Sequence, residues 1–114
     1  MACSRGLTGA HQPSDFGISS ITLAELNFGA EAKRSQKIRR AIRSFTKDVA
    51  VLPFDEACAE RFGVVAAALA RRSQPIGVYE TLVAAQALCL GLTVVTNNTR
   101  HFSTVPGLAV ESWA

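Results

Sequence analysis

The sequence predicts an α/β protein built on a parallel β-sheet, and three observations support this class. Short continuous apolar segments such as "VAVLPF" and "LTVV" are typical of strands that are buried on both faces of a parallel sheet. Segments with apolar residues three and four positions apart lie between them, as expected for helices that pack on such a sheet. The chain has 114 residues, 48% of them apolar and 18% charged, which suits one domain and excludes a disordered chain.

The N-terminal region divides into two parts of different composition. Residues 1–17 mix Gly, Ser, His, Gln and Pro without helical or strand periodicity, so we expect coil there. The segment "ISSI", residues 18–21, is expected to form the first strand. A helix over residues 22–33 should follow, because Thr22 and Glu25 have the spacing of an N-terminal capping box.

The next helix, expected over residues 35–47, is amphipathic and strongly basic. Seven of the chain's twelve Lys and Arg residues lie between residues 33 and 47, and no acidic residue lies among them. A solvated helix face explains this pattern, and so does a surface that contacts the phosphate backbone of a nucleic acid. The single Tyr and single Trp provide no evident platform for stacking bases. For the second interpretation, the candidate RNA-binding residues are Lys37, Arg40 and Arg43.

The middle of the chain continues the alternation of strands and helices. Residues 49–54 form an apolar segment that Pro53 ends, as expected for a strand. Asp55 is expected to cap a long helix that runs to about residue 72. The buried stripe of that helix is expected to contain Cys58, Phe62, Val65 and Leu69.

The C-terminal third repeats the pattern once more. A helix is expected over residues 79–90, and Gly91 is a typical C-terminal stop for it. The apolar residues 92–95 form a strand, the segment "TNNTRHF" a turn, and residues 108–112 a last short strand. Strands that alternate with helices in this way indicate parallel pairing through right-handed crossovers.

Three polar positions are expected near strand ends and helix starts, where open α/β sheets place their sites. Each has an ordinary structural explanation. Glu25 caps its helix, and Glu80 is a first-turn acid that the helix dipole favours. Asn97 and Asn98 are typical turn residues. If the fold brings these oxygens together, they form a hard-cation site for Mg²⁺ or Mn²⁺, which activates water and stabilises charge on a phosphodiester.

Three motifs in order make a more specific identification possible: "ISSITLAELNFGA", "PIGVYETLVAAQALCLGLTVVTNNTRHF" and "VPGLAVESW". Together they resemble the PIN-domain ribonucleases of the VapC type, the toxins of toxin–antitoxin pairs, over residues 18–113. The resemblance implies a Rossmann-like parallel sheet with flanking helices and a Mg²⁺-dependent (or Mn²⁺-dependent) endoribonuclease. It also implies RNA as substrate, a VapB-like antitoxin as partner, and a possible homodimer.

The resemblance also assigns roles by position. Glu25 matches the family's acid in the Thr-x-x-Glu-Leu motif, and Glu80 stands where the family usually has Asp. Asn98 stands where many relatives have a fourth acid and others have Asn. Glu25, Glu80 and Asn98 are thus the implied catalytic and metal-binding residues, and Thr96 is a supporting residue at the strand end.

The chain departs from the family pattern in ways that bear on activity. The family begins with an apolar strand ending in Asp-Thr-Asn, which this sequence lacks, so we expect the first central strand to be missing. Residues 1–17 are then an aberrant lead-in, joined by frameshift or truncation to an incomplete PIN-like domain over 18–114. Glu80 is one methylene longer than Asp, and His101 stands where relatives often have an acid. We therefore expect the cation to be weakly bound.

Two functional interpretations follow from these departures. The first is a VapC-like ribonuclease by descent whose own activity is weak or absent. The second is a non-catalytic toxin remnant that binds an antitoxin or a sibling toxin. A nucleic-acid binder that acts through its basic helix is a third, weaker option.

The location of the protein is predicted from what the sequence lacks. No uncharged apolar run is long enough to span a bilayer, and the N-terminus has no apolar signal segment. Cysteines at positions 3, 58 and 89 have no metal-binding or redox spacing. An odd number of cysteines without an export signal suggests free thiols, so we expect a cytoplasmic protein that does not associate with a membrane.

Overall fold

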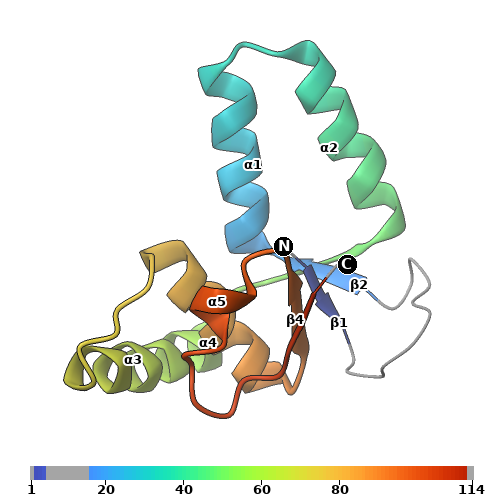
Figure 1. Ribbon diagram of the computed structural model, residues 1–114. Helices are drawn as coiled ribbons and strands as arrows, with labels where there is room; N and C mark the ends of the chain where they lie inside the picture. The colour runs from blue at the N-terminus through green and yellow to red at the C-terminus, as the bar shows by residue number, and fades with distance from the viewer. Residues whose placement is uncertain (1, 5–15, 113–114) are drawn as a thin grey trace.

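The computed structural model describes residues 2–4 and 16–112, and it has the expected α/β architecture (Figure 1). The strands β1 to β5 form one sheet in the order β3-β2-β1-β4-β5. No helix in the described part of the chain is long and apolar enough to cross a membrane. In chain order the elements are β1 (Ala2–Ser4), β2 (Phe16–Ser19), α1 (Ser20–Ala32), α2 (Gln36–Asp48), β3 (Ala50–Leu52), α3 (Glu56–Arg71), α4 (Val78–Leu90), β4 (Thr93–Thr96), α5 (Thr99–Phe102) and β5 (Val110–Ser112).

The outer strand pairs are parallel, as predicted, but the centre of the sheet is not. β2 pairs with β3 and β4 pairs with β5 in parallel, whereas β1 is antiparallel to both β2 and β4. The prediction of an entirely parallel sheet is therefore wrong at β1. β1 comes directly before β2 in the chain and lies beside it in the sheet. Antiparallel neighbours can be joined by a short connection, whereas parallel neighbours need a long crossover.

Two further expectations about the N-terminal region also need correction. The central position of the sheet is filled by β1, so it is not empty as the missing Asp-Thr-Asn strand led us to expect. The expected coil over residues 1–17 is contradicted for residues 2–4 and 16–17, which lie in β1 and β2. The expectation for residue 1 and residues 5–15 lies outside the described residues. Backbone groups of β2 and β4 need partners when they are buried, and β1 supplies them on both sides.

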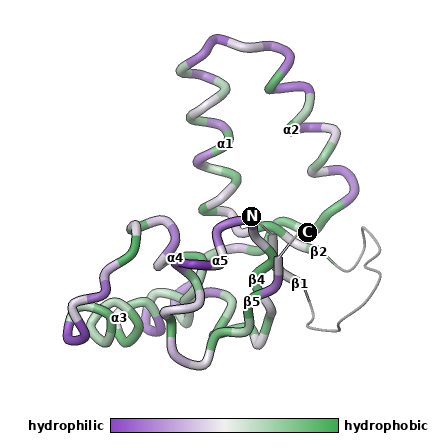
Figure 2. Tube along the Cα trace, in the orientation of Figure 1, coloured by the Kyte–Doolittle hydropathy of each residue, from purple (hydrophilic) through white to green (hydrophobic). Residues whose placement is uncertain are grey.

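The helices are arranged in two groups. α1 and α2 form a hairpin that projects away from the sheet, while α3 and α4 pack against each other beside it (Figure 1). Figure 2 shows hydrophobic residues concentrated in the body of the molecule and alternating with hydrophilic ones along α2, which has no buried residue. The main core joins α3, α4, β4 and the C-terminal segment through Val65, Leu69, Val83, Ala84, Ala85, Ala87, Val94, Phe102 and Val105.

The ends of the helices follow local side-chain chemistry. α1 begins two residues earlier than predicted, because the Ser19 hydroxyl accepts a hydrogen bond from the Ile21 amide at 3.0 Å and caps the helix. The predicted capping box at Thr22 is therefore wrong. Asp55 caps α3 as predicted, through a 3.1 Å bond from the Cys58 amide. Gly91 ends α4 in the left-handed conformation, with φ 67°, which favours glycine.

A buried glutamine connects the two halves of the structure. Gln86 of α4 is fully buried, and its Nε2 donates hydrogen bonds to the carbonyl oxygens of Leu52 at 2.9 Å and Pro53 at 3.1 Å. These carbonyls lie at the end of β3, where the chain leaves the sheet. Gln86 therefore holds the helix that carries Glu80 against the β3 side of the sheet, a connection that the sequence did not reveal.

Candidate functional site

Two of the candidate residues, Glu25 and Asn98, follow strands that end at one edge of the sheet, whereas Glu80 lies on α4, which follows α3. β2 and β4 are both antiparallel to β1, so they run in the same direction and their carboxyl ends share an edge. α1, which carries Glu25, begins directly after β2, and Asn98 follows β4. This placement agrees with the expectation that polar groups gather where the strands end.

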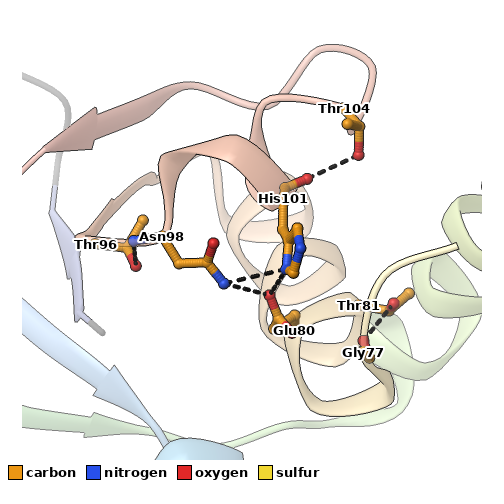
Figure 3. Close-up of polar contacts among 7 residues, drawn as sticks. All are labelled: Gly77, Glu80, Thr81, Thr96, Asn98, His101 and Thr104. Carbon is orange, nitrogen blue, oxygen red and sulfur yellow. Dashed lines mark hydrogen bonds and ion pairs between the residues drawn. The ribbon is translucent and has the colours of Figure 1, made fainter. Parts of the chain in front are cut away.

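Glu80, Asn98 and His101 come together at this edge, and we refer to them as the Glu80 cluster (Figure 3). The Asn98 Nδ2 atom donates a 2.9 Å hydrogen bond to Glu80 Oε2. His101 Nδ1 lies 3.0 Å from the same carboxylate oxygen and 3.2 Å from Asn98 Nδ2. One oxygen of Glu80 is thus shared by two nitrogen atoms from the turn after β4 and from α5.

The surrounding backbone holds the Glu80 cluster in place. The Thr96 hydroxyl accepts a 3.0 Å hydrogen bond from the Asn98 amide, which orients the turn. The segment "TNNTRHF" was predicted as a turn, and in the structure its second half forms α5, which presents His101. On the other side, Gly77 leaves space for Glu80, since a Cβ atom there would lie 2.6 Å from Glu80 Oε1.

Glu25 is half-buried on α1 and is not joined to the Glu80 cluster by any hydrogen bond or ion pair within the described residues. Residues 16–112 and the strand β1 contain no group of three His, Cys, Asp or Glu side chains placed to hold a metal ion. The structure therefore brings Glu80 and Asn98 together, through the amide nitrogen of Asn98, and does not bring Glu25 into contact with them.

The residues present do not fit a hard cation such as Mg²⁺ well. Mg²⁺ prefers an octahedral set of oxygen ligands, mainly carboxylates and water. Here the Glu80 oxygen faces an amide nitrogen and an imidazole nitrogen, and His101 stands where a further carboxylate would supply oxygen. In the sequence, His101 stands out only as a departure from the family, and no signal there indicates that its ring meets Glu80.

The predicted basic surface is present on α2. Lys37, Arg40 and Arg43 are exposed, and we call these three residues the α2 basic face. Arg39 differs from them because its guanidinium contacts the Glu31 carboxylate of α1, with Nη2 at 2.7 Å and Nε at 2.9 Å. The charge of Arg39 is thus already partnered, whereas the α2 basic face is open to an anionic partner.

Comparison with known proteins identifies the same family for most of the chain. The PIN domain family matches residues 3–108, starting within the segment that the sequence analysis set aside as a lead-in. The tRNA(fMet)-specific endonuclease VapC of Shigella flexneri is 42% identical over 98 residues, which cover 85% of this chain and 74% of that protein. Ribonuclease VapC2 of Rickettsia felis is 31% identical over 97 residues, with 84% and 72% covered.

Solved structures give the same result for the fold. The DNA-bound VapBC of Salmonella typhimurium matches with a TM-score of 0.78 at 41% identity, covering 85% of this chain and 74% of that one. VapBC2 of Rickettsia felis, bound to a DNA fragment from its promoter, matches with a TM-score of 0.79 at 31% identity, covering 86% and 74%.

Proposed function

Because the chain belongs to the PIN-domain family of VapC-type ribonuclease toxins, we propose that it is an RNA-directed toxin protein whose own Mg²⁺-dependent cleavage is weak or absent. The observation that supports this proposal is the Glu80 cluster. A cation would need the Glu80 carboxylate oxygen as a ligand, and this oxygen is already in contact with nitrogen atoms of Asn98 and His101. In this family a divalent cation supplies an activated water and stabilises charge on the phosphodiester.

We assign the reaction centre to Glu25, Glu80 and Asn98, with Thr96 as the residue that orients Asn98. The geometry offers few charged oxygens for this task, because only two of these four residues are carboxylates. Glu80 is further compromised by its length, since a displacement of about 1 Å in a catalytic group can cost about a hundredfold in rate. Weak cleavage is the consequence we expect.

RNA is the proposed substrate class, and tRNA is the form to test first. One relative with 42% identity is named a tRNA(fMet)-specific endonuclease, which supports an initiator tRNA as the first substrate. The α2 basic face is the surface that we propose contacts the phosphate backbone. Its members are Lys37, Arg40 and Arg43.

The test is cleavage of initiator tRNA by the purified chain with Mg²⁺ or Mn²⁺. Glu25→Gln removes one carboxylate without changing its size, and Glu60→Gln, on the exposed surface of α3, is the matched control. We expect little cleavage by any of the three proteins. Robust cleavage that is lost in Glu25→Gln and retained in Glu60→Gln would contradict the proposed inactivity and establish the site.

A second candidate function is binding of a VapB-like antitoxin or a sibling toxin without catalysis. Two observations favour it: the structural neighbours are toxin–antitoxin complexes, and the α1–α2 hairpin exposes large apolar side chains. Leu26, Phe28 and Phe45 are 40%, 74% and 44% exposed, respectively. Copurification with a VapB-type antitoxin should retain both proteins, and absence of retention would eliminate this candidate. A homodimer remains a further proposal, to be tested by light scattering.

A further inference from the structure

We propose that Tyr79 and Arg100 form a subsite for an unpaired nucleotide of RNA beside the Glu80 cluster, in which Tyr79 stacks on the base and Arg100 contacts a phosphate. This inference rests on the proposed function, because it requires RNA as the ligand. It adds the side chains that hold the RNA, and neither of them is among the residues assigned to the reaction centre.

Tyr79 is an exposed aromatic side chain next to the Glu80 cluster. It precedes Glu80 in the first turn of α4, and 51% of it is exposed to solvent. The other exposed aromatic residues of the described chain, Phe28 and Phe45, lie on the α1–α2 hairpin. An exposed aromatic ring offers a face on which any base can stack, and such stacking is a main way in which proteins hold single-stranded RNA.

The helix that carries Tyr79 is held in place before any ligand binds. The Thr81 hydroxyl donates a 2.9 Å hydrogen bond to the Gly77 carbonyl oxygen across the first turn of α4. Further along this helix, Gln86 is fully buried and donates hydrogen bonds to carbonyl oxygens at the end of β3. A tyrosine has only two side-chain torsions to fix, so contact with its ring costs little conformational entropy.

Arg100 supplies positive charge on the α5 side of the Glu80 cluster. It is an exposed residue and lies next to His101 in the chain. Within residues 2–4 and 16–112, no hydrogen bond or ion pair engages the Arg100 side chain. A guanidinium without a partner can bind a phosphate through two parallel hydrogen bonds. It also offsets the negative charge of Glu80, which by itself repels an RNA backbone.

The Glu80 cluster connects the two elements that carry these contacts. Tyr79 directly precedes Glu80 on α4, and Arg100 directly precedes His101 on α5. Glu80 Oε2 lies 3.0 Å from His101 Nδ1 and accepts a 2.9 Å hydrogen bond from Asn98 Nδ2 (Figure 3). The ring and the guanidinium are therefore mounted on two elements in contact with each other, as a subsite for a base and a nearby phosphate requires.

The test compares binding of two fluorescein-labelled octamers, one of uridylates and one with the same ribose–phosphate backbone but no bases. EDTA is present so that cation-dependent cleavage does not consume them. Tyr79→Ala should weaken binding of the uridylate octamer by at least about fivefold and leave binding of the abasic octamer unchanged. Tyr79→Phe keeps the ring and should bind within about twofold of wild type. Phe28→Ala, at an exposed aromatic residue of the hairpin, is the matched control and should leave both affinities unchanged.

Arg100→Gln tests the phosphate contact separately. It should weaken binding of both octamers, because both contain phosphates. The slope of log affinity against log salt should fall by about 0.7, the value for one phosphate contact on a single strand, and should stay unchanged in Tyr79→Ala. Arg71→Gln, at the exposed end of α3, is the control. Circular dichroism confirms that each variant is folded.

The outcomes separate this inference from the proposed function. A dependence on Tyr79 that requires the bases, together with the smaller salt slope in Arg100→Gln, supports the inference whether or not the chain cleaves tRNA. Equal binding by Tyr79→Ala and wild type overturns the inference and leaves RNA as the proposed substrate. If the unmodified chain binds neither octamer, the proposed function fails together with the inference.

Two other results would show that Tyr79 has a different role. An equal loss for both octamers in Tyr79→Ala would mean that the ring does not stack on a base, and would overturn the inference. Loss of copurification with a VapB-type antitoxin in Tyr79→Ala, with RNA binding intact, would place Tyr79 in a protein interface and overturn it as well.

Discussion

Gln86→Leu is the substitution for which the structure predicts the clearest loss of stability. The wild-type side chain is fully buried and donates two hydrogen bonds, to the carbonyl oxygens of Leu52 and Pro53. Leucine has a similar size and removes both donors. The two carbonyls then lose this partner, and a polar group that is left buried without one costs about 1–3 kcal/mol. Because Leu52 is half-buried and Pro53 is exposed, we expect each loss to lie in the lower half of that range.

The net magnitude also includes a compensating gain. Among the described residues, Gln86 Oε1 is buried without a hydrogen-bond partner, and leucine eliminates that unfavourable group. Taking two lost bonds at the lower half of the range and subtracting about 1 kcal/mol for this gain, we expect a destabilisation of about 2 kcal/mol. For a domain of this size, the melting temperature should fall by about 8 °C.

Urea denaturation followed by circular dichroism measures this change in the free energy of unfolding. Gln74→Leu, at an exposed loop position, is the matched control and should be close to neutral. Gln86→Glu should be worse than Gln86→Leu at neutral pH, because a carboxylate would face two carbonyl oxygens, and its deficit should shrink as the pH falls. If Gln86→Leu is as stable as the control, the hydrogen bonds from Gln86 do not hold α4 to the sheet.

The remaining predictions concern an ionised cap, a buried thiol and the basic surface. The hydrogen bond from the Cys58 amide lowers the pKa of Asp55 below 3.8, so the stabilisation by its carboxylate is present at neutral pH and is lost as the pH falls through that lowered pKa. Urea midpoints of Asp55→Ala and wild type should therefore differ at neutral pH and converge in acid, while the control Asp48→Ala shows no such convergence. Burial raises the pKa of Cys58 to about 11, so its thiol should react slowly in the native protein. In a Cys3→Ser background, iodoacetamide should modify Cys89 in the native protein and Cys58 only on unfolding. Equal modification rates of the two cysteines in the native protein would contradict this prediction. Replacing the α2 basic face by alanines should reduce the slope of log affinity for single-stranded RNA against log salt by about 2, and an equal reduction in Arg39→Ala would argue against the assignment.

The alternation of strands and helices was predictable because each element has its own local signal. The cap at Asp55, the stop at Gly91 and the apolar run of β4 follow from short-range chemistry, and the structure confirms them. The start of α1 was misplaced because Thr22 and Glu25 imitate a capping box, while Ser19 competes successfully for the cap. Two possible N-caps, Ser19 and Thr22, lie three residues apart, and the local sequence does not indicate which of them begins the helix.

The parts that could not be predicted depend on contacts between distant segments. Glu80 and His101 are 21 residues apart, and only the packing of α5 beside α4 shows that they meet. Gln86 donates hydrogen bonds to backbone carbonyls 34 and 33 residues away. Every residue has a backbone carbonyl, so the sequence contains no pattern that would identify these two as the partners. β1 has three residues, too few for a strand periodicity to be visible. The assignment of Glu25 as a site residue came from family resemblance and stays a prediction.

The antiparallel position of β1 has a consequence for how the protein behaves at high concentration. Among the described strands, β2 and β4 do not pair with each other, so the sheet consists of two parallel pairs that one three-residue strand joins. When β1 detaches, the edges of β2 and β4 that it covered both become exposed. The β1 segment of a second molecule can then insert between them. An exchange of β1 between two molecules would therefore rebuild both interfaces of the strand, and the pairing of β1 within its own chain is what keeps the domain closed on itself.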